Sequence, residues 1–112
     1  MTVYSFGDVI LVPFPFTDLQ QSKQRPAVIV SNSRYQAERA DVVLMAISSQ
    51  MRFPQTYGES VVLDWQTAGL LKPSVIKPVL ATLEQRLVRK ALGRLSVRDR
   101  SGLQEAMRLI FG

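Results

Sequence analysis

An arginine followed by a proline is the residue pair in this chain best suited to chemistry. Arg25 precedes Pro26, and residues 27–30 are a short apolar run rich in β-branched side chains, which predicts a strand covered on both faces. Proline is tolerated at the first residue of a strand and drives the residue before it toward an extended backbone. We therefore expect Arg25 at a fixed strand mouth, where a guanidinium can grip phosphate with two parallel hydrogen bonds. A solvated surface arginine fits the same residues.

A second group of polar side chains follows another apolar run. Residues 42–47 predict a central strand, and Ser48, Ser49 and Gln50 come directly after it. Hydroxyl and amide groups at the end of a buried strand are suited to phosphate contacts. Turn-forming residues that return a strand to solvent would produce the same sequence, so both interpretations stand at this point.

The residue types that are missing narrow the possible chemistry. The chain of 112 residues contains no histidine and no cysteine, which excludes imidazole acid–base catalysis, thiol catalysis, disulfides and zinc–thiolate sites. The 9 acidic residues are scattered singly, so we predict no metal site and no cofactor. A chain without cysteine also fits a reducing cytoplasm.

Length and charge indicate one basic domain. Residues 1–112 fit a single domain by length, no apolar run is long enough to span a bilayer, and the start does not read as a signal peptide. A net charge of +5 favours polyanionic partners, nucleic acid first, although it also suits a small soluble protein. Much of the positive charge gathers between residues 86 and 100.

The remaining pattern predicts the elements that must position Arg25 and Ser48. We expect strands over residues 9–14, 27–31, 42–47, 60–63, 74–83 (interrupted near Pro78) and 91–95. A long loop, residues 14–24, joins the first two strands. Ser96 is the predicted N-cap of a helix that runs to the end of the chain. Many short strands followed by one helix predict a mainly β, small and strongly curved barrel with the helix packed on it.

Four sequence pieces, in this order, resemble the PemK/MazF family of toxins from bacterial toxin–antitoxin systems. They are Gly7-Asp8-Val9, Arg25-Pro26-Ala27-Val28, Ala46-Ile47-Ser48-Ser49-Gln50, and Ser74-Val75-Ile76 followed by Thr82-Leu83. The resemblance implies an SH3-like barrel of the CcdB/Kid/MazF type and a homodimer. It also implies a prokaryotic, cytoplasmic endoribonuclease that cuts single-stranded RNA without a metal and is silenced by a cognate antitoxin.

The resemblance also assigns roles to individual residues. It makes Arg25 catalytic, together with Ser48 at a position where relatives carry threonine. Gln20 stands where many relatives have glutamate, and Lys77 and Val79 stand where some have arginine and aspartate. The expected substrate contacts are Phe16, Thr17, Gln20, Lys23, Ser49, Gln50 and Lys77. The proton transfers of such a reaction would fall to a bound water, or to Arg25 as the donor to the leaving oxygen.

Two other functions fit the same fold. One is a non-enzymatic toxin that poisons DNA gyrase, a class that does not need an arginine before proline at the strand mouth. The other is an RNA-binding or regulatory module without nuclease activity, which the departures at Gln20 and Val79 would explain. Intact messenger RNA during growth arrest would favour the first, and tight RNA binding without cleavage would favour the second.

Overall fold

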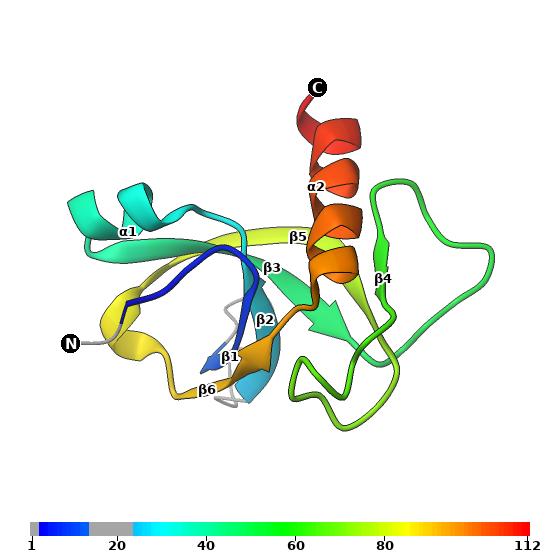
Figure 1. The fold of residues 1–112 in the computed structure, drawn as a ribbon, viewed down its shortest axis with the longest axis horizontal. Coiled ribbons are helices and arrows are strands. Elements are labelled where there is room, and N and C mark those ends of the chain that lie inside the picture. Colours follow the sequence, from blue (N-terminus) through cyan, green and yellow to red (C-terminus); the bar gives the residue numbers. More distant parts are fainter. Residues whose placement is uncertain (1–2, 14–23) are drawn as a thin grey trace.

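The computed structural model describes residues 3–13 and 24–112, and Figure 1 shows their arrangement. Six strands and two α-helices make up this part of the chain. The elements are β1 (Asp8–Pro13), β2 (Gln24–Ile29), α1 (Ser33–Glu38), β3 (Asp41–Ser48), β4 (Ser60–Val62), β5 (Ser74–Glu84), a 3₁₀ turn η1 (Gln85–Leu87), β6 (Lys90–Arg94) and α2 (Val97–Phe111). The predicted short strands with a C-terminal helix are confirmed, and one short helix, α1, lies between β2 and β3.

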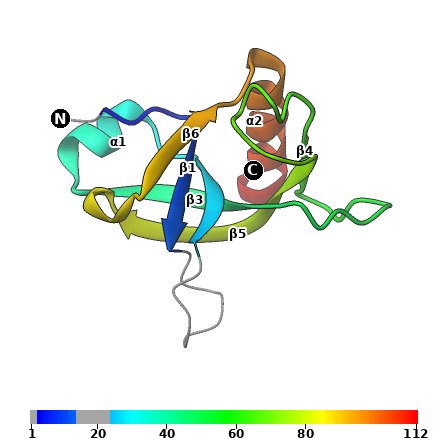
Figure 2. The same cartoon turned by 90° about the horizontal axis from the view of Figure 1, so that it is seen from below.

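The strands form one antiparallel sheet in the order β4-β5-β3-β2-β1-β6. Figure 2 shows how strongly this sheet curls, which confirms the prediction of a small, curved, mainly β fold with a helix. The predicted interruption near Pro78 is a register shift inside a single strand: β5 runs unbroken, and its pairing with β3 slips between Met45 and Ile47. A bulge bends a strand without ending it, because only the extra residues lose their partners.

Side chains that alternate along the strands build two separate cores. Val9, Val28 and Met45 belong to one cluster, and their chain neighbours Ile10, Ala27 and Leu44 belong to the other. Successive strand residues point to opposite faces, so the sheet buries apolar side chains on both. The predicted two-sided cover of residues 27–30 is confirmed, since all four are buried.

The C-terminal helix closes the first of these cores. Ser96 is its N-cap, and the Ser96 hydroxyl accepts from the backbone N–H of Asp99 at 3.3 Å. Leu103 is fully buried in the cluster, and Met107 and Ile110 pack against it, as their helical spacing predicted. In Figure 1, α2 stands beside β4 at the edge of the sheet.

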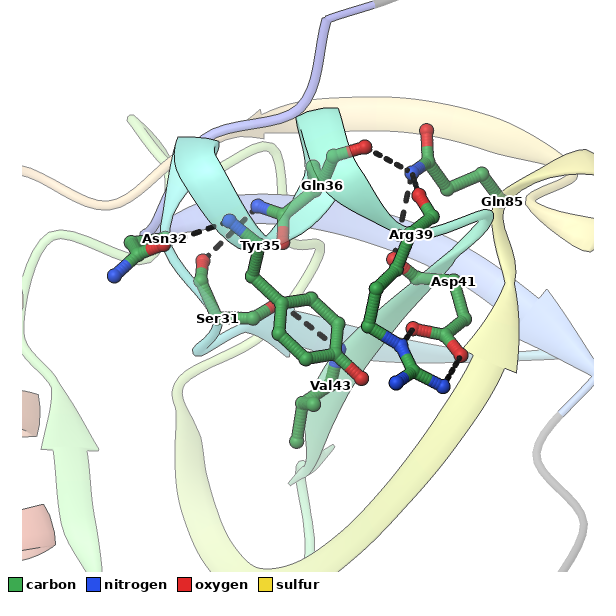
Figure 3. Close-up of polar contacts among 8 residues, drawn as sticks. All are labelled: Ser31, Asn32, Tyr35, Gln36, Arg39, Asp41, Val43 and Gln85. Atoms are coloured by element: carbon green, nitrogen blue, oxygen red, sulfur yellow. Dashed lines mark hydrogen bonds and ion pairs between the residues drawn. The ribbon is translucent and has the colours of Figure 1, made fainter.

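Polar contacts around α1 fasten the connection between β2 and β3 (Figure 3). The Gln85 side-chain amide donates to the carbonyls of Gln36 and Arg39, both at 3.0 Å. At the base of this connection, the Ser31 hydroxyl accepts from the N–H of Val43 at 2.9 Å, next to a backbone bond from the Val30 N–H to the Val43 carbonyl. The Ser31 hydroxyl thus accepts the kind of hydrogen bond that a backbone carbonyl accepts in a regular strand pair. These bonds fix how β2 is aligned against β3.

Candidate functional site

Arg25 lies inside a strand, one residue after its start. The prediction that the strand begins at Pro26 or Ala27 is wrong, because β2 starts at Gln24 and pairs Arg25 with Val12 and Pro26 with Leu11 on β1. Pairing between β2 and β3 begins only at Ala27, so the missing N–H of proline costs no bond on that side. The Arg25 side chain is exposed. No described carboxylate lies within 4.0 Å of it.

The alignment of β2 with β3 places Arg25 and Ser48 just beyond the paired part of the two strands. Ala27 pairs with Ala46 and Val28 with Met45, and Arg25 and Ser48 lie two residues beyond the Ala27–Ala46 pair. Side chains two residues apart share a face, and opposite residues on antiparallel strands share it too. Two groups that are 23 positions apart in the sequence therefore lie on one face of the sheet, each near the end of its strand.

Apolar residues flank this pair on both sides. Val12, the partner of Arg25 on β1, is fully buried, and Val75, the partner of Ser48 on β5, is nearly so. Val75 belongs to the sequence piece Ser74-Val75-Ile76 quoted for the family resemblance, whereas Val12 was not singled out. The place of both valines in apolar strands is the signal that predicts their burial. Buried apolar neighbours lower the local dielectric constant. The attraction between a guanidinium and an anion is therefore stronger beside them than in bulk water.

The Ser48 hydroxyl is oriented by its own turn. Its oxygen accepts from the backbone N–H of Gln50 at 3.1 Å, and that bond leaves the hydroxyl proton available to a ligand. Ser49 and Gln50 are exposed immediately after β3. Lys77 lies in the shifted part of β5, directly after Ile76, which pairs with Ile47. Of the predicted site residues that the structure describes, Arg25, Ser48 and Lys77 lie on the adjacent strands β2, β3 and β5, and Ser49 and Gln50 follow β3.

Four predicted contact residues lie outside the described part of the chain: Phe16, Thr17, Gln20 and Lys23. Within residues 3–13 and 24–112, no three acidic, histidine or cysteine side chains gather in a way that could hold a metal ion. No helix in the same residues is long and apolar enough to cross a membrane.

Several arginines of the last third of the chain take part in local ion pairs. Several are paired with nearby carboxylates: Arg86 with Glu84 at 2.6 Å, Arg98 with Asp64 at 2.7 Å, and Arg108 with Glu105 at 3.4 Å. The Arg98 guanidinium, helped by the Ser96 hydroxyl, holds the pKa of Asp64 down to about 2. Part of this charge cluster therefore serves local structure. Lys90, in contrast, lies opposite Leu11 on β1, at the same end of the sheet as Arg25.

The chain matches one protein-family model over most of its length. Residues 5–111 match the family model described as PemK-like, MazF-like toxin of type II toxin–antitoxin system. No curated protein matches the chain.

Solved structures with a similar fold were found over nearly the whole chain. One is an endoribonuclease in complex with its cognate antitoxin from a mycobacterial species, with 18% identity, 96% of this chain and 91% of that chain covered, and a TM-score of 0.71. The Mycobacterium tuberculosis toxin MazF-mt6 is 20% identical, with 89% of this chain and 91% of that chain covered and a TM-score of 0.72. The match in the MazE–MazF complex of Deinococcus radiodurans is 13% identical, with 100% of this chain and 98% of that chain covered and a TM-score of 0.75.

Proposed function

Because this chain belongs to the PemK-like, MazF-like toxins of type II toxin–antitoxin systems, we propose that it is an endoribonuclease that cuts single-stranded RNA. The observation that carries the proposal is that Arg25 and Ser48 each lie two residues beyond the Ala27–Ala46 pair, on the same face of β2 and β3. A cation and a hydroxyl donor side by side suit a single phosphate group. Similar folds occur in proteins described as endoribonucleases, which supports the same activity here.

The reaction that fits these groups uses the RNA as its own nucleophile. The 2′-OH loses its proton to water and attacks the adjacent phosphorus, the bond to the 5′-oxygen breaks, and that oxygen takes up a proton. The products are a 2′,3′-cyclic phosphate and a 5′-OH end. Arg25 and the Ser48 hydroxyl stabilise the extra negative charge of the pentavalent phosphorane, where one such donor is typically worth about 3–4 kcal/mol of barrier. Arginine stays protonated, so it acts as a donor and not as the base.

The other predicted residues extend the site along the RNA. Lys77 and Lys23 contact the flanking phosphates, so affinity falls as salt rises. Phe16, Thr17, Gln20 and Gln50 contact the bases, because single-stranded RNA exposes base edges and faces. Ser49 contributes its backbone N–H to the reacting phosphate.

The partners follow from the family and from charge. A cognate antitoxin silences the toxin through an acidic, partly disordered segment that binds near Arg25 and Lys77, as a net charge of +5 favours. Structures of this fold have been solved with an antitoxin bound, which supports such a partner. The toxin acts as a homodimer in the cytoplasm of a prokaryote, where its RNA substrate is found.

Arg25→Ala tests the assignment. We expect the purified variant to fold normally and to lose RNA cleavage by about a hundredfold to a thousandfold, as removal of one charge-stabilising donor does in other active sites. Cleavage of a long transcript is followed on a denaturing gel in the presence of EDTA. Arg108→Ala is the matched control, because Arg108 is an exposed arginine near the end of α2.

Two outcomes would contradict the proposal. Full cleavage by folded Arg25→Ala would remove the arginine from the mechanism. Loss of wild-type cleavage in EDTA, restored by a divalent ion, would show metal-dependent chemistry. Tight RNA binding without any cut would instead identify a binding module, and growth arrest with intact messenger RNA would point to a gyrase poison.

A further inference from the structure

A hollow of about 350 Å³ lies at the end of β1 that is remote from Arg25. Its walls come from Ser5 and Phe6 before β1, from the start of α1, from the end of β6 and from the first half of α2. Val12, the strand partner of Arg25, lies four residues beyond Asp8 along β1, which is about 13 Å of extended chain. In Figure 2 the two ends of β1 are clearly apart. The hollow is therefore separate from the candidate catalytic site.

Two arginines line the hollow, and one of them is held firmly. The Nη1 group of Arg100 donates to the carbonyl of Leu95 at 2.6 Å. The Arg100 side chain passes so close to Gly7 that a Cβ on that residue would lie 2.7 Å from Cδ, and the φ of +91° at Gly7 also favours glycine. The Gly7 backbone is itself bonded to Ile29 and Leu95. Arg100 is thus fixed before any ligand arrives.

The charge of Arg100 has no counter-charge in the described part of the chain. No described carboxylate lies within 4.0 Å of its guanidinium, and none of the residues that line the hollow is acidic. The neighbouring Asp99 carboxylate is already occupied, because it accepts from the N–H groups of Leu63 at 2.9 Å and Asp64 at 2.7 Å. Arg94, the second arginine, is only loosely paired with Asp8 at 3.9 Å. Half-buried positive charge of this kind is stabilised by a bound anion.

We propose that this hollow binds a phosphate dianion, either as inorganic phosphate or as the terminal group of a mononucleotide. The two guanidiniums match its double charge. The donors around them are the side chains of Ser5, Asn32, Ser33, Ser101 and Gln104. A carboxylate is satisfied by one guanidinium fork, whereas the three terminal oxygens of phosphate need several donors from different directions.

The apolar part of the wall indicates room for more than the phosphate. Phe6 and Val97 lie beside the arginines, and the volume is at the lower end of that found for small-molecule sites, roughly 300–1,000 Å³. A phosphodiester inside an RNA chain carries only one negative charge, so the pair of arginines favours a terminal phosphate over the RNA backbone.

The test is a ¹H–¹⁵N correlation spectrum of the full chain titrated with inorganic phosphate at constant ionic strength, near pH 7.5. We expect saturable shifts of the amides of Phe6, Ser33 and Ser101, while those of Ser49 and Gln50 stay in place. Absence of saturation, or shifts centred on Ser49 and Gln50, would overturn the proposal.

Charge variants show whether the hollow itself binds. Arg94→Gln should weaken phosphate binding about tenfold, as loss of one charged hydrogen bond does. Arg108→Gln removes the same charge at the far end of α2 and should change the dissociation constant by less than about twofold. Equal weakening by both variants would reduce the effect to net charge and would refute the site. The spectrum of each variant reports whether it is folded.

Two further ligands separate the sources of the phosphate. Adenosine 5′-monophosphate that binds several-fold more tightly than inorganic phosphate, with adenosine alone inactive, would identify a mononucleotide. Equal affinities would identify inorganic phosphate. An RNA oligonucleotide without terminal phosphates that shifts the same amides would contradict the proposal, because the hollow would then be part of the RNA path.

Discussion

At the scale of single residues, the proposed chemistry depends on two donors that differ in kind. Arg25 supplies a permanent charge from an exposed position, and Ser48 supplies a hydroxyl that is already oriented by the N–H of Gln50. Neither group can remove a proton from the 2′-OH at neutral pH. Charge stabilisation by positioned donors is therefore the main catalytic effect available to this pair.

Ser48 can be tested by a pair of substitutions. Ser48→Ala removes the hydroxyl and should lower kcat/KM by roughly tenfold to a hundredfold, because a hydrogen bond to a charged group is worth about 1.5–3 kcal/mol. Ser48→Thr keeps the hydroxyl and should retain most of the activity. Single-turnover cleavage of a short RNA measures both variants. Equal activity of Ser48→Ala and the wild type would exclude the hydroxyl from the mechanism.

At the scale of elements, the turn after β4 is tied to the start of α2 by charge. The Asp64 carboxylate receives two bonds from Arg98, both at 2.7 Å, and one from the Ser96 hydroxyl. Asp99 lies three residues after the N-cap Ser96, where a capping box carries an acidic residue, but its carboxylate accepts from the N–H groups of Leu63 and Asp64. The two aspartates together fix the turn against the helix.

The pKa of Asp64 gives this contact a defined pH dependence. The carboxyl has a pKa of about 2 in the folded chain against 3.8 as its ordinary value, chiefly because of Arg98. A lowered folded pKa stabilises the protein above the unfolded value, and that stability is lost as pH falls through the folded value. Asp64→Asn should therefore lower Tm at pH 7, and the difference from the wild type should shrink between about pH 4 and pH 2.

Thermal unfolding of both proteins across that pH range measures the effect. Glu105→Gln is the matched control, since Glu105 pairs with Arg108 on the exposed face of α2. We expect its Tm to follow that of the wild type at every pH. A constant Tm difference for Asp64→Asn from pH 7 to pH 2 would contradict the assignment.

Much of the element order was predictable because apolar periodicity and cap residues are local signals. The helix after Ser96 and the strand ending at Ser48 lie close to where the sequence placed them. The start of β2 was not predictable, because Pro26 reads as a strand boundary while its pairing with β1 depends on Leu11. The juxtaposition of Arg25 and Ser48 is likewise set by register, which α1 and Ser31 fix through contacts distant in sequence.

At the scale of the whole molecule, a group of exposed apolar side chains marks a surface that another protein chain could cover. Phe53, Tyr57 and Phe111 are 75%, 71% and 62% exposed, and the Tyr57 hydroxyl donates to the carbonyl of Leu109 at 3.3 Å. Gly58 lies against Ile110, so the loop at residues 53–58 and the end of α2 form one surface. Apolar patches of this kind mark interaction sites, and a two-fold dimer is the commonest way to cover one.

Phe111→Ser tests whether this surface forms the proposed homodimer. The substitution removes this side chain from both halves of a two-fold interface, at a cost of about 1.5–3 kcal/mol each. The dissociation constant of the dimer should therefore rise by roughly a hundredfold or more. Sedimentation equilibrium measures the constant. Val3→Ser changes an equally exposed apolar residue and should leave it unchanged. If Phe111→Ser dimerised as tightly as the wild type, the interface would lie elsewhere.

The most direct measurement is the chemistry of the RNA ends left by the purified wild-type protein acting on a long transcript in EDTA. We predict a few defined cut sites in single-stranded regions, each with a 2′,3′-cyclic phosphate on one side and a 5′-OH on the other. Fragments with 5′-phosphate ends, or a transcript that stays intact, would contradict an RNA-cleaving site built on Arg25 and Ser48.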